Sequence, residues 1–278
     1  MKNVKQIWQE TVKQLEKVYD RREAENISYL LLEDAFGLSK TAILFEEEKE
    51  IDSDQLSGYI QRLLLYEPIQ YVIGIADFFG RKFHIAPGAL IPRPETEELV
   101  SLIIKENKVQ NPKILDVGVG SGCIAITLAL ELNASVFGTD VSKEAIAIAE
   151  KNARELNANV RFYHSNILTE NLPESELDIL VSNPPYIPQM EFDKMAKNVT
   201  DFEPELALFV PDDDPLIFYK RIAEEGLNTL KKGGKLYFEI HEDFGEEVKA
   251  YLQNAGYSNV VIHQDMQGKE RMVSAVKV

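Results

Sequence analysis

The stretch KILDVGVGSG, residues 113–122, decides the fold class of this chain. Its first half is rich in branched apolar residues and predicts a buried strand over 114–117. A glycine-rich turn follows directly and opens a helix predicted over 122–132. From Lys113 to the last residue, strand and helix patterns alternate, which is typical of a parallel sheet. The sequence therefore predicts an α/β domain in this part of the chain.

The remaining elements of this domain follow the same alternation. Further strands are predicted at 136–140, 159–164, 177–182, 235–240, 258–263 and 271–277, and further helices at 143–156, 214–231 and 243–255. The run Lys231-Lys232-Gly233-Gly234 is a helix stop signal, so we expect the helix over 214–231 to end there.

The N-terminal part of the chain has a different pattern, with apolar residues at helical spacing and little that could do chemistry. Helices are predicted at 4–20, at 23–36 with Gly37 as its end, at 39–46, and from Asp52 to Pro68. Residues 71–83 predict a turn and a short β-hairpin. We expect a small helical domain over 1–72 that holds a partner, a hairpin linker over 73–91 and the α/β domain over 92–278.

Composition and charge argue against several classes of protein. With 278 residues, 45% of them hydrophobic, the chain can bury a sizeable core, yet no apolar run is long enough for a transmembrane helix. The N-terminus lacks the apolar centre of a signal peptide, and we expect a cytoplasmic location. The 30 basic and 46 acidic residues give a net charge of −16, which opposes direct binding to nucleic acid. One cysteine and four scattered histidines give no metal-binding pattern, so no metal is expected.

The stretch LDILVSNPPY, residues 177–186, carries the strongest sign of chemistry. Pro184 and Pro185 cannot donate to a sheet ladder, so the strand must end before them. Because the residue before a proline is pushed out of the α region, Asn183 and Pro184 are both held extended. A stiff turn at the carboxyl end of a central strand is where open α/β sheets bind their ligands. A purely structural turn is the alternative interpretation.

The residue types in this turn suit a planar NH2 group. Asn183 offers a side-chain carbonyl, and the turn can direct main-chain carbonyls beside it, so that two acceptors match the two N–H hydrogens. Tyr186 supplies a flat surface for a planar amide or base. Such a nitrogen is a poor nucleophile, so holding it against an electrophile is mostly proximity and orientation. We therefore predict Asn183, Pro184 and Tyr186 as catalytic residues, and these three with Pro185 as substrate-binding residues.

The glycine turn and a later acid predict a nucleotide-like cofactor. Gly118, Gly120 and Gly122 form G-x-G-x-G and let the main chain approach a ligand closely. Asp140 ends the next strand, about 20 residues on, where an acid can bind ribose hydroxyls. Dinucleotides and S-adenosylmethionine both fit this pattern. A dinucleotide fingerprint would have a glycine where this chain has Cys123, and the amine-orienting turn favours S-adenosylmethionine.

The stretch LIPRPETE, residues 90–97, precedes the cofactor-binding half. Its two prolines stiffen it, and Glu95 or Thr96 is expected to start a helix over 96–106. Arg93 lies between the prolines, and we predict that it lines the site and binds substrate.

Over nearly the whole chain, these motifs resemble those of the peptide chain release factor glutamine methyltransferases of the PrmC/HemK type. The matching segments are 67–71 with Gly74, 90–97, 116–122, Asp140, 183–187 and Glu203-Pro204 with Ala207-Leu208. The resemblance implies a Rossmann-like class I methyltransferase domain with a seven-stranded, mostly parallel sheet, preceded by a helical bundle and a β-hairpin linker. It also implies S-adenosyl-L-methionine as cofactor, and methylation of the glutamine amide in the Gly-Gly-Gln motif of class I release factors.

By position, the resemblance also implies roles for individual residues. The methionine part of the cofactor would lie along Gly118, Val119, Gly120, Ser121 and Gly122. Asp140 would hold the ribose, and Asn166 and Ile167 would flank the adenine. Residues 183–186 would grip the glutamine amide, with Asn183 also beside the cofactor. Departures are small: Val119 stands where Thr or Cys is frequent in the family, Asn166 where an acid is frequent, and residues 211–215 replace a more glycine-rich stretch.

Two other hypotheses remain open from the residues alone. The exocyclic amine of a flipped adenine would also suit Asn-Pro-Pro-Tyr, so an adenine-N6 nucleic-acid methyltransferase is the main alternative. The acidic charge and the lack of a basic recognition region weigh against it. The third hypothesis is a binding module without catalysis, in which the helical domain docks a partner and the α/β domain only holds a nucleotide.

Overall fold

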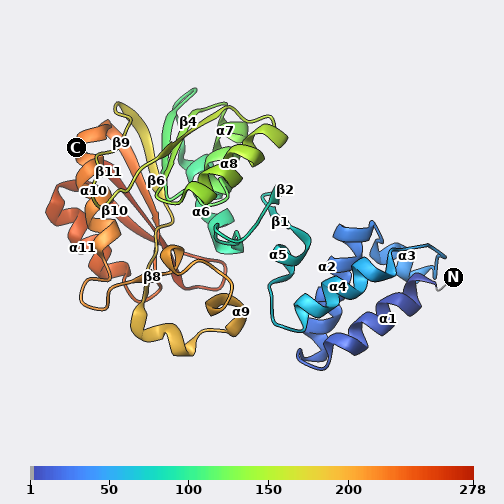
Figure 1. Cartoon of the computed structure of the whole chain (residues 1–278). Helices are drawn as coiled ribbons and strands as arrows, with labels where there is room; N and C mark the ends of the chain where they lie inside the picture. Colours follow the sequence, from blue (N-terminus) through green and yellow to red (C-terminus); the bar gives the residue numbers. More distant parts are fainter. Residues whose placement is uncertain (1–2) are drawn as a thin grey trace. The chain divides into compact units, whose positions relative to one another are not determined.

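The computed structural model describes residues 3–278 and divides into two compact units (Figure 1). The first unit contains the chain up to Ile75 together with Ala196–Phe202. The second contains Ala76–Met195 and Glu203–Val278. Each unit has its own buried apolar clusters, which is what an independently packed domain requires.

The first unit is a small bundle of helices. They are α1 (Val4–Leu15), α2 (Arg21–Phe36), α3 (Lys40–Leu44), α4 (Ser53–Leu63) and α5 (Ile69–Ile73). Side chains of Asn3, Asp20 and Asp52 cap the first, second and fourth of these by accepting from main-chain N–H groups. The apolar stripes that predicted helices form the shared core, in which Leu15, Leu31 and Leu63 are fully buried.

Several predicted limits in the first unit were wrong, and helix α4 ends at Leu63 rather than at Pro68. Helix α1 ends at Leu15 rather than residue 20, because Asp20 must be extended to cap α2. Residues 69–73 form the helix α5, where a turn was predicted from Tyr71. The apolar face of α5 belongs to the core, and the guanidinium of Arg62 donates to the main-chain oxygens of Tyr71 and Val72 near its end.

The second unit is built on a seven-stranded sheet, as predicted. The strands lie in the order β10 (Tyr257–Gln264), β11 (Glu270–Lys277), β9 (Leu230–Glu239), β6 (Leu177–Ser182), β3 (Lys113–Val117), β4 (Ser135–Asp140) and β5 (Val160–His164). Only β11 runs against the others, since it pairs antiparallel with both of its neighbours. The short strands β1 (Ile75–Phe78) and β2 (Arg81–His84) form the predicted hairpin.

Helices cover both faces of this sheet (Figure 1). Helices α6 (Pro94–Glu106), α7 (Cys123–Leu132) and α8 (Lys143–Glu155) contribute to one buried cluster, and α10 (Ile217–Thr229) and α11 (Gly245–Ala255) to the other. Because both faces are covered, the central strands β3 and β6 are almost fully buried, and their sequences are mostly apolar apart from Asp116 and Asp178.

The helix predicted over 214–231 is shorter in the structure, because the expected stop signal, residues 231–234, lies in strand β9. Helix α10 ends at Thr229, and Lys231 to Gly234 belong to β9. Leu230 pairs with Leu177 at the start of β6, and the amine of Lys231 bonds Asp178 at 2.7 Å. These strand contacts hold the segment extended.

Several short elements were not predicted from the sequence. They are β7 (Ile187–Pro188), β8 (Phe209–Val210), α9 (Lys197–Thr200) and the 3-10 turns Gln189–Lys194 and Glu205–Ala207. Helix α6 begins at Pro94 rather than residue 96, since the fixed φ of proline suits the first helical position.

Candidate active site

A cavity of about 260 Å³ opens at the carboxyl ends of the parallel strands of the second unit. It is lined by the segments that follow β3, β4, β5 and β6, the place where open α/β sheets bind ligands. Eleven of the predicted site residues line it: Arg93, Gly118, Val119, Gly120, Ser121, Asp140, Asn166, Ile167, Asn183, Pro184 and Pro185. Gly122 and Tyr186 do not line it.

The glycine turn has a conformation that side chains rarely adopt. Gly118, Gly120 and Gly122 have φ of 80°, 54° and 82°. The main-chain N–H groups of Gly118 and Val119 both donate to the carbonyl of Thr139, at 2.8 and 3.0 Å. The turn is therefore tied to the end of β4, and its bare backbone faces the cavity.

Asp140, the acid predicted to bind the cofactor, is hydrogen-bonded to the glycine turn. Its carboxyl oxygens accept from the N–H of Gly120 at 2.9 Å and from the N–H of Ser142 at 2.8 Å. Burial raises its pKa, and the main-chain donors oppose this shift. Each carboxyl oxygen can still accept a second bond, so Asp140 can bind hydroxyls while it holds the turn.

The cavity fits S-adenosylmethionine in its donor set as well as in its position. The buried hydroxyl of Ser121 lines it and bonds no nitrogen or oxygen of residues 3–278. Ile167 supplies an apolar wall beside Asn166, whose side-chain oxygen accepts from the N–H of Leu168. A buried hydroxyl, a carboxylate and an apolar wall thus line one cavity.

The Asn-Pro-Pro-Tyr turn lies next to the glycine turn. A Cβ placed on Gly118 would come within 4.0 Å of the main-chain oxygen of Asn183. Pro184 is buried, whereas Asn183 is half-buried and directs its amide NH2 to the hydroxyl of Thr96, at 3.2 Å. The side-chain oxygen of Asn183 is therefore the end left to accept from a ligand.

Arg93 lies at the cavity but already has a protein partner. Its guanidinium pairs with the carboxylate of Glu203 at 2.6 Å, and the same carboxylate accepts from the N–H of Ile91. Glu203 is buried, and the following residues Pro204 and Leu206 line the cavity. Arg93 thus joins two segments of the cavity wall, and its contact with substrate stays a prediction.

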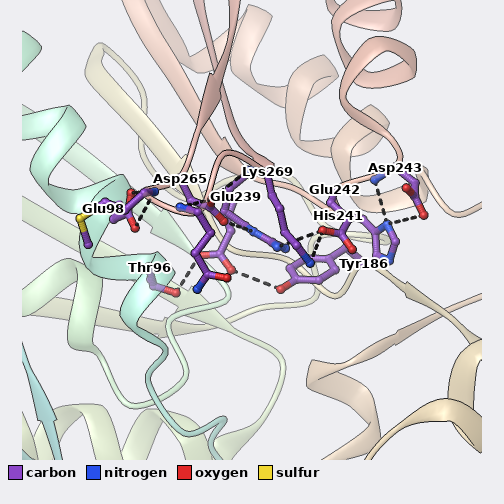
Figure 2. A network of polar contacts seen from close by, with 12 residues as sticks. Thr96, Glu98, Tyr186, Glu239, His241, Glu242, Asp243, Asp265 and Lys269 are labelled. Atoms are coloured by element: carbon purple, nitrogen blue, oxygen red, sulfur yellow. Dashed lines mark hydrogen bonds and ion pairs between the residues drawn. The ribbon is translucent and has the colours of Figure 1, made fainter.

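A buried carboxylate that the sequence analysis missed lies behind the Asn-Pro-Pro-Tyr turn. Glu239, at the end of β9, is 1% exposed. It accepts from the hydroxyl of Thr96 at 2.7 Å and from that of Tyr186 at 3.3 Å, and Figure 2 shows the two approaching it from opposite sides. Thr96 was predicted as a possible helix start, but its hydroxyl bonds the sheet instead.

Glu239 makes folding stability depend on pH. Burial raises its pKa from 4.5 to about 7, and Glu95 adds to this, whereas Arg271 and the bonds from Thr96 and Tyr186 lower it. At a pH between about 4.5 and about 7, Glu239 is protonated in the folded protein but has released its proton in the unfolded chain. Stability due to this group therefore falls as pH rises from about 4.5 to about 7, by roughly 3 kcal/mol in all.

Denaturant unfolding of the wild type and of Glu239→Gln across this pH range checks the prediction. As pH rises, the unfolding free energy of Glu239→Gln should increase relative to that of the wild type, and this difference should level off above a pH of about 7. Glu247, exposed on α11, gives the matched control Glu247→Gln. Parallel curves for Glu239→Gln and the wild type would contradict the prediction.

Of the residues that the sequence analysis missed, Glu239 has a signal that could have revealed it. It lies one residue before the end of the strand predicted over 235–240, close to the placement of Asp140 at the end of its strand. Asp116, two residues before Gly118, was likewise overlooked. It is fully buried, and burial raises its pKa to about 8.

Two negative findings concern residues 3–278. They contain no group of three or more metal-ligating side chains that could hold an ion. None of their helices has both the length and the apolar composition needed to cross a membrane.

Comparison with known proteins identifies the family. The description "Methyltransferase small domain" matches residues 95–201, and "PrmC N-terminal domain" matches residues 6–74. A crystal structure of a methyltransferase from Pyrococcus furiosus superposes with a TM-score of 0.54 at 20% identity, covering 80% of this chain and 98% of that chain. This likeness confirms the predicted fold class.

Curated relatives match almost the whole chain. The release factor glutamine methyltransferase of Bacteroides thetaiotaomicron is 45% identical over 266 residues, covering 94% of this chain and 95% of the relative. That of Flavobacterium psychrophilum is 43% identical over 271 residues, with coverage of 94% and 95%. The adenine-N6 alternative is not favoured by these matches. At this identity and coverage, the chain belongs to the release factor glutamine methyltransferase family.

Proposed function

We propose that this protein transfers a methyl group from S-adenosyl-L-methionine to the side-chain amide nitrogen of a glutamine, that of the Gly-Gly-Gln motif in class I peptide chain release factors. The observation that carries the proposal is the side-chain oxygen of Asn183. It is free to accept, because the NH2 end is bound to Thr96, and it belongs to a turn that adjoins the glycine turn.

Asn183 and its neighbours orient the acceptor in this proposal. S-adenosylmethionine supplies an electrophilic methyl group when it is bound. The side-chain oxygen of Asn183 and the main-chain oxygen of Pro184 accept from the two N–H hydrogens of the glutamine, which places its nitrogen towards the methyl carbon. Tyr186 bounds this turn on the side of Glu239. No histidine base is required, since the proton can leave to water once the nitrogen is alkylated.

The cofactor would be held by the residues that line the rest of the cavity. Gly118 to Ser121, which line the cavity, would let the methionine end approach the backbone closely, Asp140 would accept from ribose hydroxyls, and Asn166 with Ile167 would flank the adenine. The predicted role of Gly122 is indirect: a Cβ there would meet Ile126 at 2.9 Å, so the glycine permits the turn to pack on α7 and α8.

The remaining predictions belong to the same proposal. The helical domain over 1–72 would bind the release factor, with 73–91 as linker and 92–278 as the catalytic domain. A substrate that works in translation termination implies a cytoplasmic location. The net charge of −16 supports a protein substrate rather than direct binding to nucleic acid.

Mass spectrometry of a purified class I release factor, incubated with enzyme and S-adenosylmethionine, tests the proposal. The peptide that contains Gly-Gly-Gln should gain about 14 Da, the mass of one CH2 group. A release factor with that glutamine replaced by alanine is the control and should gain nothing. Methylation of adenine in DNA without any gain on the release factor would overturn the proposal.

A further inference from the structure

The two ends of an asparagine side chain have nearly the same shape but opposite hydrogen-bonding roles. An Asn183 that receives the NH2 of a substrate must present its oxygen, because its own NH2 would meet donor with donor. The neighbouring hydroxyl of Thr96 cannot decide the matter alone, since a hydroxyl can donate or accept. Some further group must therefore set the direction of the bond between Asn183 and Thr96.

That group is the carboxylate of Glu239. At a pH above its pKa of about 7, Glu239 is ionised, and a carboxylate can only accept, so the single hydroxyl proton of Thr96 is committed to Glu239 in the 2.7 Å bond. The oxygen of Thr96 is then left as an acceptor, and the NH2 of Asn183 must face it. In this ionised state the chain of bonds runs from Asn183 to Thr96 to Glu239 and has one direction only.

The surroundings strengthen this direction. Thr96 is 3% exposed and Glu239 is 1% exposed, so bulk water cannot readily replace either partner. The other oxygen of Glu239 accepts from Tyr186 (Figure 2). One carboxylate thus bonds the last residue of the Asn-Pro-Pro-Tyr turn directly and is linked to the first, Asn183, through Thr96. The positive charge of Arg271 lowers the pKa of Glu239 and so favours the ionised carboxylate, whereas the negative charge of Glu95 raises this pKa.

We infer that Thr96 and Glu239 are positioning residues that fix the carboxamide of Asn183 with its oxygen towards the methyl acceptor. The inference rests on the proposed function, in which Asn183 receives the substrate NH2. Neither residue touches the reacting atoms. They act by excluding the reversed orientation of Asn183, in which substrate and side chain would present donors to each other.

Two matched substitutions at Thr96 separate positioning from packing. Thr96→Val keeps the shape and removes the hydroxyl, whereas Thr96→Ser keeps the hydroxyl and removes a methyl group. We expect kcat to fall about 10- to 100-fold in Thr96→Val and to stay within about threefold in Thr96→Ser. Cofactor affinity, measured by calorimetry, should change less than about twofold in both. A packing role would give the reverse order, with the serine variant more affected, and would overturn the inference.

A readout without substrate makes this inference separable from the proposed function. In the side-chain amide NMR spectrum, the Asn183 NH2 resonances should move in Thr96→Val and stay in place in Thr96→Ser. If they do so while the wild type fails to methylate a release factor, the positioning stands and the proposed function falls. If the wild type methylates and Thr96→Val retains its kcat, the positioning falls and the function stands.

Glu239→Gln provides a second variant if the valine protein does not fold. Thr96 and Tyr186 donate to different oxygens of Glu239, and a glutamine would put an NH2 group, which cannot accept, at one of these two positions. We expect kcat to fall about tenfold at pH 8, where the wild-type carboxylate is ionised, with cofactor affinity unchanged. Unchanged kcat in this variant would contradict the role of Glu239.

Discussion

Replacing Asn183 with alanine is expected to lower kcat by about two to three orders of magnitude while leaving the affinity for S-adenosylmethionine nearly unchanged. The alanine removes the side-chain oxygen that, in the proposed function, accepts from the glutamine NH2. The glycine turn and Asp140, which lie on other strands, stay as they are. Single-turnover kinetics with a release factor and calorimetry with the cofactor together measure the two quantities.

The matched control for this prediction is Asn254→Ala, since Asn254 is exposed on α11. Its kcat should equal that of the wild type. A loss of cofactor affinity in Asn183→Ala as large as the loss of kcat would contradict the prediction, because it would make Asn183 chiefly a cofactor ligand.

Asp140→Ala should have the opposite signature, with cofactor affinity weakened about 100-fold and kcat at saturating cofactor altered only a few-fold. Two effects add together in this variant. The cofactor loses a carboxylate that can accept from its ribose hydroxyls, and the N–H of Gly120 loses its partner at 2.9 Å, which loosens the glycine turn. Equilibrium binding of S-adenosylmethionine, with kcat measured at high cofactor concentration, checks the split.

Asp140→Asn distinguishes the two effects. An asparagine keeps one oxygen, which can still accept from the N–H of Gly120 and from a ribose hydroxyl, but it lacks the charge of the carboxylate, and its NH2 cannot accept from the N–H of Ser142. Its affinity should lie between those of the wild type and Asp140→Ala. Wild-type affinity in Asp140→Ala would show that the ribose is bound elsewhere.

Most of the fold was predictable because each element has a local cause. Strand β3, the glycine turn and α7 follow from two mostly apolar runs separated by three glycines, and β6 ends at two prolines that cannot join a ladder. The end of α10 was not predictable in this way. The pairing of Leu230 with Leu177 extends the segment, and those residues are far apart in the chain.

By itself, the sequence determined which strand ends line the cavity. Asp140 and Asn183 follow branched apolar runs, and parallel strands bring such ends to one edge of a sheet. Only the tertiary structure decided which way Asn183 faces and what holds Arg93. Thr96 and Glu239 are 143 residues apart, and Arg93 and Glu203 are 110 residues apart. Hydrogen bonds across such separations leave no periodicity or spacing in a sequence, because they depend on how the sheet and its helices pack.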